Sequence, residues 1–430
     1  MLTRRLFLGG AVATSLFPRA ARGDVRKDDF SRGFPLGINH LLQLGESRAV
    51  GAQTPTLPAK VITLTSFPGM VMFKGGIVTA GAGNLSGFVP LTETLRNRGV
   101  NGETGVAAIG QAIIKASGNF SPQQMGWGGD RQLLGSSAGF AGHRVSELLG
   151  RAELGRMRDQ ILFGYLTSTE LRVPYTLSGV PFAVGVNDYI HKTSSTVFAS
   201  VIERYLLGEV IDYYKSVTGD QRIVPIVMPL TCAHRAKGYS EPYLAIAQLQ
   251  LAEKHTNFMI SSPGYQVDFA ANGIHESATG YRLRGAYDGV ALWWWHVRGE
   301  KFSPTQPRQW KLEGGVATIK FSAPFGPVVL DDTWVANPGN FGFVARDARG
   351  DLIEIIKTST VPGDGFSIEV VCSDPPKTIE YAWANGEESC GRLSGPRGCV
   401  ADSFPLTFEL DADGTSVQLR NYSVPFKLEF

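Results

Sequence analysis

The sequence predicts an α/β fold, a parallel sheet covered by helices, followed by a β-sandwich. From about residue 34 to 296, short apolar runs alternate with amphipathic helical stretches. After about residue 300 the pattern changes to short runs of period-two character, separated by Gly, Pro and Asp turns. The segment 298–310, with two prolines and few apolar residues, is the expected linker between the two parts.

The individual elements follow from this pattern. Strand and helix alternation at these lengths is typical of a parallel sheet covered by helices. We expect strands within 179–188, 222–230 and 256–264, and helices at 198–217, 242–255 and 276–295. Short strands are expected after the linker, within 315–323, 351–358, 366–373, 378–384 and 416–424.

Composition excludes two broad classes. The 430 residues are 43% hydrophobic and 19% charged, so the chain can bury a core and is not a disordered protein. The net charge is +2, from 41 basic and 39 acidic residues. This balance gives no electrostatic argument for nucleic acid as a partner.

The first residues resemble an export signal. Thr3-Arg4-Arg5-Leu6-Phe7-Leu8 looks like a twin-arginine motif, an apolar stretch follows to Phe17, and Ala21-Arg22-Gly23 is a small-x-small cleavage site. The apolar stretch is too short to span a bilayer, and no later segment reaches the ~18 apolar residues that a spanning helix needs. We therefore expect a removable signal at 1–23 and a periplasmic or secreted protein without a membrane anchor. The alternative is a basic tail that happens to precede an apolar run.

The four cysteines form no CxxC pair, so a zinc or redox site is not supported. Cys390 and Cys399 flank a loop rich in Gly and Arg and are candidates for a disulfide in an oxidising compartment, with Cys372 as the alternative partner. Cys232 is expected to be a buried thiol. No phosphate-binding GxxxxGK[ST] loop and no HExxH metal motif is present, so no metal and no organic cofactor are expected.

Three short blocks carry the residues of a possible acyl-transfer site. They are Gly45-Glu46-Ser47, Gly185-Val186-Asn187-Asp188 and Asn272-Gly273-Ile274-His275. Each block alone reads as an ordinary turn. In a parallel sheet, ligands bind at the carboxyl ends of the strands. We therefore expect Ser47, Asn187 with Asp188, and the loop after residue 262 to share one edge of the sheet.

The order of these blocks resembles SGNH (GDSL-type) hydrolases, and most of all their carbohydrate, sialate-type O-acetylesterase branch. That branch typically has Gly-Gln-Ser where this chain has Gly45-Glu46-Ser47. Its Gly-x-Asn-Asp block matches 185–188, and its Asp-x-x-His block matches 272–275. The glycine of its second block falls within 135–148, where Gly142 is the chosen candidate. The resemblance covers most of residues 34–296.

The resemblance implies a fold and a division of the chain. It implies a three-layer, flavodoxin-like SGNH-hydrolase domain at 24–300, with a parallel sheet between two helical layers. The remaining 301–430 would form the β-sandwich domain that often follows in bacterial and phage-like members.

The resemblance also implies an exported serine esterase that removes O-acyl, most simply O-acetyl, groups from a carbohydrate. His275 would take the Ser47 proton and then give it to the leaving sugar oxygen. The oxyanion would be held by the Ser47 and Gly142 backbone N–H groups and by the Asn187 side-chain amide. No metal and no cofactor takes part.

Two positions depart from the family pattern. Asn272 stands where the family usually has the aspartate that orients the histidine. Three readings follow: a Ser–His dyad oriented by Asn272 or a backbone carbonyl, a substitute carboxylate such as Asp268 or Glu276, or a degenerate site. Glu46 is the second departure, because its charge beside a developing oxyanion is unfavourable unless it points away.

Each of the remaining candidate substrate-binding residues allows two interpretations. His143 would line the substrate pocket, or it caps and packs. Asp188 would contact substrate, or it braces the Asn187 loop. The run 293–295, three tryptophans, would offer a sugar-stacking platform or pack against the β-domain. For the whole chain, the rival functions are a lipase or thioesterase on the same fold and a non-catalytic carbohydrate-binding or surface-structural protein.

Overall fold

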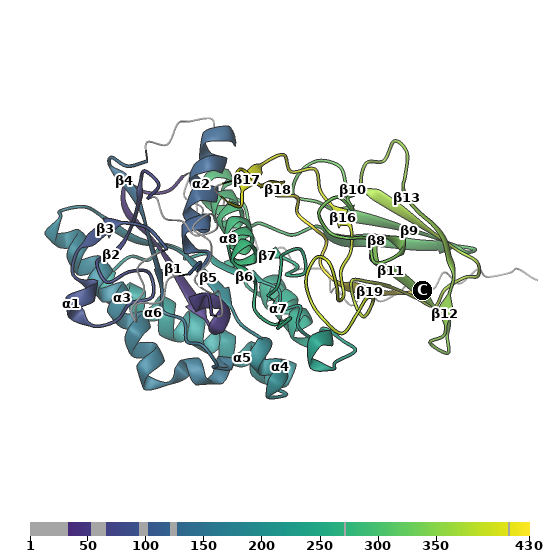
Figure 1. The fold of residues 1–430 in the computed structure, drawn as a ribbon, viewed down its shortest axis with the longest axis horizontal. Coiled ribbons are helices and arrows are strands. Elements are labelled where there is room, and N and C mark those ends of the chain that lie inside the picture. Colours follow the sequence, from purple (N-terminus) through teal and green to yellow (C-terminus); the bar gives the residue numbers. More distant parts are fainter. Residues whose placement is uncertain (1–32, 53–65, 94–101, 121–126, 271, 412) are drawn as a thin grey trace, which may run out of the picture.

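The computed structural model describes residues 33–52, 66–93, 102–120, 127–270, 272–411 and 413–430. The predicted signal at 1–23 lies outside these residues. The chain forms an α/β part and a β-rich part, which lie side by side along the long axis of the molecule (Figure 1). The predicted domain boundary after residue 300 falls in the connection between them. That connection is shorter than the predicted linker, because η7 ends at Arg298 and β8 begins at Gln306.

The α/β part is built on one seven-stranded sheet with the strand order β3-β2-β4-β1-β5-β6-β7. All neighbouring strands are parallel except β2 and β3, which are antiparallel. Every residue of the central β1 is buried, as expected for a parallel strand covered on both faces. The strands are β1 (Gly37–Gly45), β2 (Met70–Phe73), β3 (Phe88–Pro90), β4 (Arg131–Ser137), β5 (Tyr175–Ala183), β6 (Ile226–Pro229) and β7 (Phe258–Ser262).

Helices cover both faces of this sheet, so the predicted three-layer α/β architecture is confirmed. One face carries α2 (Val106–Phe120) and α8 (Ala278–Trp293). The other carries α3 (Arg151–Glu170), α5 (Ser195–Glu203), the π-helical η5 (Arg204–Ile211), α6 (Asp212–Thr218) and α7 (Tyr243–Lys254). The predicted helix at 198–217 thus continues through a π-helical segment. The shorter elements are η2 (Ser47–Val50), α1 (Ala82–Leu85), η4 (Val145–Leu149), α4 (Val186–Ile190), η6 (Arg235–Lys237), η7 (Trp294–Arg298) and η8 (Asn340–Gly342).

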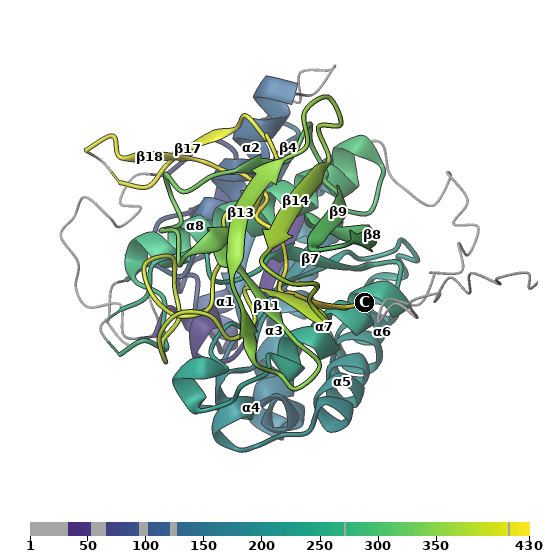
Figure 2. The same cartoon turned by 90° about the vertical axis from the view of Figure 1, so that its right-hand side faces the viewer.

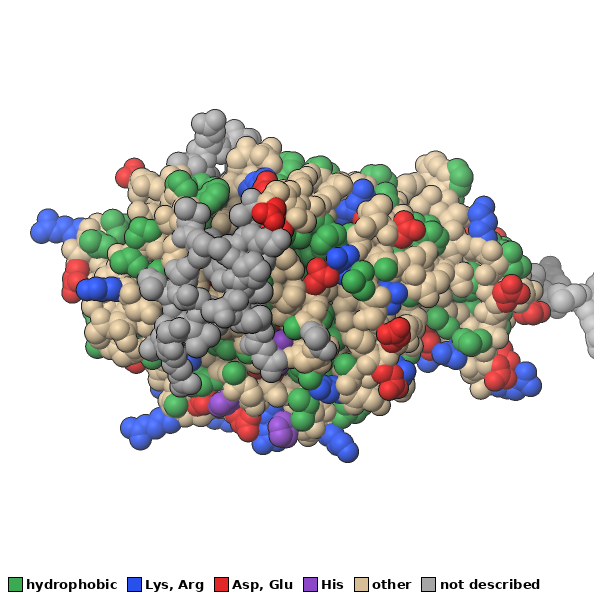
Figure 3. Space-filling model, viewed as in Figure 1, with side chains coloured by type: hydrophobic (Ala, Val, Ile, Leu, Met, Phe, Trp, Pro, Cys, Tyr) green, Lys and Arg blue, Asp and Glu red, His purple; other side chains and the backbone are tan. Residues whose placement is uncertain are grey.

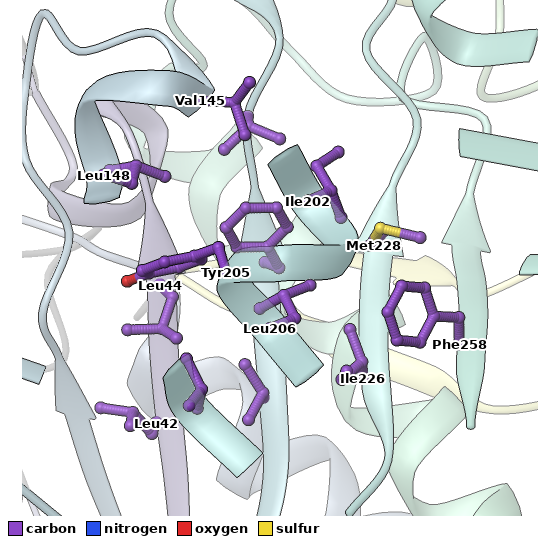
Figure 4. Packing of buried hydrophobic residues seen from close by; sticks show 14 of the residues in the cluster. Leu42, Leu44, Val145, Leu148, Ile202, Tyr205, Leu206, Ile226, Met228 and Phe258 are labelled. Carbon is purple, nitrogen blue, oxygen red and sulfur yellow. The ribbon is translucent and has the colours of Figure 1, made fainter. Parts of the chain in front are cut away.

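The core beneath the α3 and α5 face holds the central strands in place (Figure 4). Leu42 and Leu44 of β1 point into it, beside residues of β6, β7, η4, α5 and η5. Burying one such large apolar side chain stabilises the fold by about 1.5–3 kcal/mol. The labelled members are Leu42, Leu44, Val145, Leu148, Ile202, Tyr205, Leu206, Ile226, Met228 and Phe258.

The β-rich part is a sandwich of two four-stranded antiparallel sheets, as predicted (Figure 2). One sheet has the order β13-β14-β9-β8 and the other β12-β11-β15-β19. The sheets pack face to face, since the Phe321 ring on β9 lies 5.9 Å from the Phe426 ring on β19. The strands are β8 (Gln306–Glu313), β9 (Val316–Ser322), β10 (Val329–Leu330), β11 (Phe343–Arg346), β12 (Leu352–Ile353), β13 (Ile355–Thr360), β14 (Ser367–Cys372), β15 (Thr378–Tyr381), β16 (Val400–Ala401), β17 (Thr407–Glu409), β18 (Ser416–Gln418) and β19 (Phe426–Glu429).

The two parts share a hydrophobic cluster. The hairpin β17–β18 and the residues leading into it pack on α2 and α8, where the ring of Phe404 lies 5.5 Å from that of Phe120. Trp293, Trp294 and Trp295 are all buried in this cluster. The run therefore packs between the parts, and an exposed sugar-stacking platform is excluded.

The four cysteines are all free and buried. Cys390 Sγ donates to the carbonyl of Gly273 at 2.6 Å, and Cys399 Sγ donates to that of Val335 at 3.4 Å. The structure therefore contains neither the candidate disulfide Cys390–Cys399 nor one from either of these residues to Cys372.

The surface in Figure 3 mixes basic and acidic side chains over both parts. Within the described ranges, none of the helices has the length and apolar character needed to cross a bilayer.

Candidate active site

Ser47 lies at the carboxyl end of the central strand. β1 ends at Gly45, whose φ is +130°, and a Cβ added there would lie 2.1 Å from the carbonyl oxygen of Ala183 on β5. Only glycine fits this close approach and backbone conformation. The chain then turns sharply into η2, with Ser47 as its first residue and 4% exposed. The glycine of the Gly-Glu-Ser block thus makes the turn that presents Ser47 at the edge of the sheet.

Two buried side chains brace the turn. The carbonyl of Ala49 in η2 accepts hydrogen bonds from Gln43 Nε2 at 2.6 Å and from Ser137 Oγ at 2.7 Å. Gly139 packs against the same residue, since a Cβ added at Gly139 would lie 2.7 Å from the Ala49 Cβ. Contacts of this kind hold a reactive side chain on a rigid support.

His275 reaches Ser47 from a tight turn before α8. The turn is closed by a bridge between Phe269 and Glu276, and by a hydrogen bond from the Ala270 N–H to the His275 carbonyl at 2.8 Å. The half-buried His275 ring places its Nε2 2.9 Å from Ser47 Oγ. The fold therefore joins two residues that lie 228 positions apart in the sequence.

The surroundings of His275 favour a neutral ring. Burial lowers the pKa of His275, the charge of Glu276 opposes this shift, and the charges of Arg48 and Lys237 add to it. A ring that is neutral near pH 7 has a lone pair available, as a general base requires.

The Asn272 amide contacts the other ring nitrogen of His275, Nδ1, with its nitrogen end. Its Oδ1 accepts hydrogen bonds from the backbone N–H groups of Ile274, at 3.0 Å, and His275, at 3.1 Å. These two donors determine which end of the amide is oxygen. Nδ2 therefore faces His275 Nδ1, at 3.0 Å, and donates to it. The ring proton then sits on Nε2, pointing at Ser47, which is the opposite of the tautomer that accepts the serine proton.

The two candidate substitute carboxylates are held elsewhere. Glu276 is fully buried and accepts from Arg48 Nε at 2.7 Å. Asp268 accepts from Arg392 Nε at 2.6 Å. Their arginine partners fix both carboxylates away from the role that the family's aspartate plays.

The Arg48–Glu276 pair joins the two halves of the site. Arg48 directly follows Ser47, Glu276 directly follows His275, and the two side chains are 1% and 0% exposed. Arg284 adds a second positive charge, with its Nε 3.4 Å from Glu276 Oε1. Burial alone would raise the pKa of Glu276, but the two arginines outweigh it and lower that pKa. Removing one partner of such a pair typically costs about 3–5 kcal/mol, because a buried charge is left unpaired.

Sequence reasoning missed Arg48 as part of the site. The available signal was a pair of opposite charges, one directly after each candidate catalytic residue. Local pattern alone does not show that the two charges meet.

The Glu46 carboxylate binds the start of α4 and the Asn187 side chain. Gly185, with φ +114°, ends the strand connection and starts α4. The Glu46 carboxylate accepts from the backbone N–H groups of Val186, at 2.7 Å, and Asn187, at 3.1 Å, and from the Asn187 side-chain amide. Burial raises the pKa of Glu46 to about 7, against the opposing effect of these hydrogen bonds. Asn187 is thereby held beside the residue that precedes Ser47.

Gly142 is exposed, with φ +82°, and a Cβ added there would meet no heavy atom within 4 Å. No described contact links Gly142 to Ser47. Gly139, three residues earlier, is the glycine of this loop that packs on η2.

His143 and Asp188 have protein partners of their own. His143 Nε2 lies 2.8 Å from Glu153 Oε1. Asp188 is fully buried, and its Oδ2 accepts from the Val145 N–H at 3.1 Å. This placement supports the bracing role for Asp188. Of the predicted residues, the described contacts bring together Ser47, His275, Asn272 and, through Glu46, Asn187.

Clusters of three or more His, Cys, Asp and Glu side chains suited to a metal ion do not occur in the described part of the chain.

Comparisons with known proteins support the fold. No protein-family model matches the sequence, and no curated protein sequence matches it. Among solved structures, a carbohydrate acetylesterase from Xanthomonas citri matches with a TM-score of 0.53 at 14% identity, over 91% of this chain and 80% of that chain. A carbohydrate acetylesterase family member from Sinorhizobium meliloti matches at 0.32, with 16% identity, over 59% and 97%. An acetylxylan esterase from Geobacillus stearothermophilus matches at 0.29, with 13% identity, over 59% and 94%. The first of these matches spans both parts of the molecule, so this chain shares the fold of that carbohydrate acetylesterase.

Proposed function

We propose that the protein is a serine esterase that removes O-acyl groups, most simply O-acetyl groups, from a carbohydrate. The observation that carries this proposal is the Ser47 Oγ to His275 Nε2 distance of 2.9 Å at the carboxyl end of the central strand. The likeness in fold to a carbohydrate acetylesterase supports the choice of substrate class.

The proposed reaction uses side chains of this chain only. Ser47 Oγ attacks the acyl carbon while His275, in the tautomer that carries its ring proton on Nδ1, takes the serine proton at Nε2. The oxyanion of the tetrahedral intermediate is held by the Ser47 N–H and by the second N–H of the Asn187 amide, the first being donated to Glu46. Gly142 remains the proposed third donor. His275 then protonates the leaving sugar oxygen, and water releases the acyl group from Ser47 by the reverse sequence.

The test is the hydrolysis of p-nitrophenyl acetate by residues 24–430, beside Ser47→Ala and His275→Ala. We expect turnover by the parent protein and its loss in both variants. Acetylated oligosaccharides and longer acyl and thioester substrates then separate the carbohydrate esterase from a lipase or thioesterase. Equal rates for the three proteins and the buffer blank would contradict the proposal.

A second candidate function is a carbohydrate-binding or surface-structural protein with a degenerate site. The Asn272 amide favours it, because it donates to His275 Nδ1 and so stabilises the tautomer that cannot accept the Ser47 proton. A fluorophosphonate probe separates the two functions. An esterase is labelled at Ser47, whereas a degenerate protein binds a glycan and stays unlabelled.

We also propose export through the twin-arginine motif of the first residues, to the periplasm or beyond. We expect a processed N-terminus near residue 24 in the exported fraction. Substitution of Arg4 and Arg5 by lysine should leave the precursor in the cytoplasm.

A further inference from the structure

The buried Glu46 carboxylate accepts three hydrogen bonds from one short segment of the chain. Its Oε1 accepts from the Val186 N–H at 2.7 Å. Its Oε2 accepts from the Asn187 N–H at 3.1 Å and from the Asn187 side-chain amide. Glu46 and Asn187 lie 141 positions apart in the sequence. Both oxygens of the residue before Ser47 are thus occupied by the start of α4.

The start of α4 has no cap of its own. The first N–H groups of a helix lack partners inside the helix, and Gly185, which precedes α4, has no side chain that could accept from them. Gly185 is itself fixed, because its φ is +114° and a Cβ added there would lie 2.9 Å from the Thr231 Cβ. Glu46 therefore supplies the cap that the local sequence lacks.

The backbone on each side of this contact is also held. The Glu46 N–H donates to the Ala183 carbonyl on β5 at 3.1 Å, which fixes the chain just before Ser47. One residue after Asn187, the buried Asp188 accepts from the Val145 N–H at 3.1 Å. With both backbones fixed, the freedom that remains to the Asn187 amide is rotation of its side chain, and the bond to Glu46 Oε2 restricts that rotation.

We propose that Glu46 is a positioning residue for the Asn187 amide, and that it acts through the place of its Oε2 and not through its charge. The inference rests on the proposed function, in which the second Asn187 N–H stabilises the oxyanion. An amide group is planar, so fixing one N–H of the Asn187 side chain also fixes the direction of the other. A misplacement of about 1 Å can cost ~10²-fold in rate.

Two conservative variants separate the place of the acceptor from its charge. Glu46→Gln removes the charge but keeps the length, so its amide oxygen can take the place of Oε2 and accept from both Asn187 donors. Glu46→Asp keeps the charge but withdraws the acceptor by one methylene. With p-nitrophenyl acetate and the purified full chain, we expect kcat within ~3-fold of the parent for Glu46→Gln and at least ~10-fold lower for Glu46→Asp. The KM of both should stay close to that of the parent, because the oxyanion forms only after substrate binding.

A double variant tests whether Glu46 acts through Asn187. Asn187→Ala alone should lower kcat by ~10²-fold, because it removes one oxyanion donor. Adding Glu46→Asp to Asn187→Ala should give no further loss, since the group that Glu46 positions is already absent. A purely structural effect of Glu46→Asp would instead lower kcat again.

Asp402 in the β-rich part offers a matched control. It is a buried carboxylate that likewise binds one asparagine twice, accepting from the Asn421 N–H at 2.8 Å and from the Asn421 side-chain amide at 2.6 Å. Asp402→Asn removes the charge and Asp402→Glu changes the length, as the two Glu46 variants do. Both should leave kcat unchanged. Thermal unfolding of every variant shows that the protein assayed is folded.

The outcomes separate this inference from the proposed function. Loss of kcat in Glu46→Gln with retention in Glu46→Asp would overturn the inference, because charge would then be what matters. Additive losses in the double variant would overturn it as well. If Glu46→Asp does not fold, a folded Glu46→Gln protein with kcat more than ~10-fold below the parent still contradicts the inference. No turnover by the parent protein would contradict the proposed function and this inference together.

Discussion

One serine–histidine pair lies beyond the end of β1 and a second lies within the sheet, and their hydrogen bonds have nearly the same length. Ser47 Oγ is 2.9 Å from His275 Nε2, and Ser136 Oγ is 2.7 Å from His40 Nε2. The first pair stands at the carboxyl end of β1, and the second lies within the sheet, on β4 and β1. The surroundings of each pair, rather than the length of its serine–histidine hydrogen bond, decide which pair is suited to acyl transfer.

The inner pair belongs to a closed network. The Tyr175 hydroxyl lies 2.7 Å from His40 Nδ1, and Ser136 Oγ donates to Gln160 Oε1 at 2.7 Å. His40 Nε2 therefore donates to Ser136. Burial lowers the pKa of His40 to about 3, so the ring is neutral throughout the working pH range of most enzymes. Every polar atom of the pair points at a protein partner inside the sheet, where no substrate reaches it.

The histidine of the outer pair, Ser47 and His275, has the same tautomer, and a different type of residue donates to its Nδ1. The Asn272 amide donates to His275 Nδ1, just as Tyr175 donates to His40 Nδ1. What the outer pair adds is a half-buried ring, a strand end and the Asn187 amide nearby. A serine–histidine hydrogen bond is thus compatible with a purely structural role, and position in the fold carries the functional argument.

The largest expected difference between the pairs is in activity. Ser47→Ala should lower kcat/KM by ~10⁴-fold or more, because it removes the attacking oxygen. Ser136→Ala should leave kcat/KM unchanged and lower the free energy of unfolding by about 1–3 kcal/mol, because His40 Nε2 and Gln160 Oε1 each lose a partner. Ester hydrolysis and urea unfolding measure the two effects. An inactive but fully stable Ser136→Ala protein would reverse the assignment.

Replacing the histidines should affect stability more at the inner pair, whereas replacing the serines affects activity more at the outer pair. His40→Ala opens a cavity in the sheet, leaves the Tyr175 hydroxyl without its partner and removes the donor to Ser136, so we expect a loss of about 3–5 kcal/mol. His275→Ala alters a half-buried turn and should cost less than about 1 kcal/mol. Urea unfolding of both proteins measures the difference. Equal losses would mean that the outer pair, too, is mainly structural.

The fold was largely predictable because the spacing of apolar residues along each segment indicates which of its residues are buried. The predicted helices at 242–255 and 276–295 contain α7 and α8, and the predicted strand at 222–230 contains β6. The fate of the tryptophan run was not predictable. A run of aromatic residues has the same pattern whether it is exposed or covered, and the segment that covers it here, 404–419, comes more than a hundred residues later.

The site was predictable only in part, for a related reason. Ser47 and His275 carry recognisable neighbours, so their order in the chain identified them. The roles of Arg48 and Glu46 depend on contacts with residues far away in sequence, and no local spacing encodes those contacts. Asn272 was recognised as a departure, but the direction of its amide depends on the backbone donors of the folded turn.

Changing Asn272 tests the tautomer argument directly. In Asn272→Asp a carboxylate keeps both backbone hydrogen bonds and accepts from His275 Nδ1–H, which leaves Nε2 free to take the Ser47 proton. We expect kcat to rise ~10²-fold, a fraction of the ~10⁴-fold effect of the reverse change in a serine protease triad. Steady-state hydrolysis of p-nitrophenyl acetate measures it.

The matched control is Asn337→Asp. Asn337 Oδ1 also accepts two backbone hydrogen bonds, from Gly339 at 2.9 Å and Phe341 at 3.0 Å, in an exposed turn of the β-rich part. The control should leave kcat unchanged. If Asn272→Asp gives no gain, the amide does not limit the reaction and another group orients His275.

The smallest expected effect concerns pH. Since the pKa of His275 lies below its ordinary value of 6.5, and since the neutral ring is the base, activity should be full above that pKa and fall as the pH drops through it. The charge of Lys237 contributes to this lowering, so Lys237→Gln should move the inflection of the kcat/KM profile upward by a few tenths of a unit. The profile is measured between pH 4.5 and about 8.

Lys311→Gln serves as the control, because Lys311 is exposed on β8 and paired with Glu313.

His40 affects the pH dependence of stability, whereas His275 affects that of activity. The folded pKa of His40, about 3, lies below the ordinary 6.5, so its contribution to stability is full above pH 6.5 and is lost as the pH falls toward 3. Activity should therefore be lost at a higher pH than the fold. Coincident loss of activity and folded structure would show that the inflection reports unfolding and not the titration of His275.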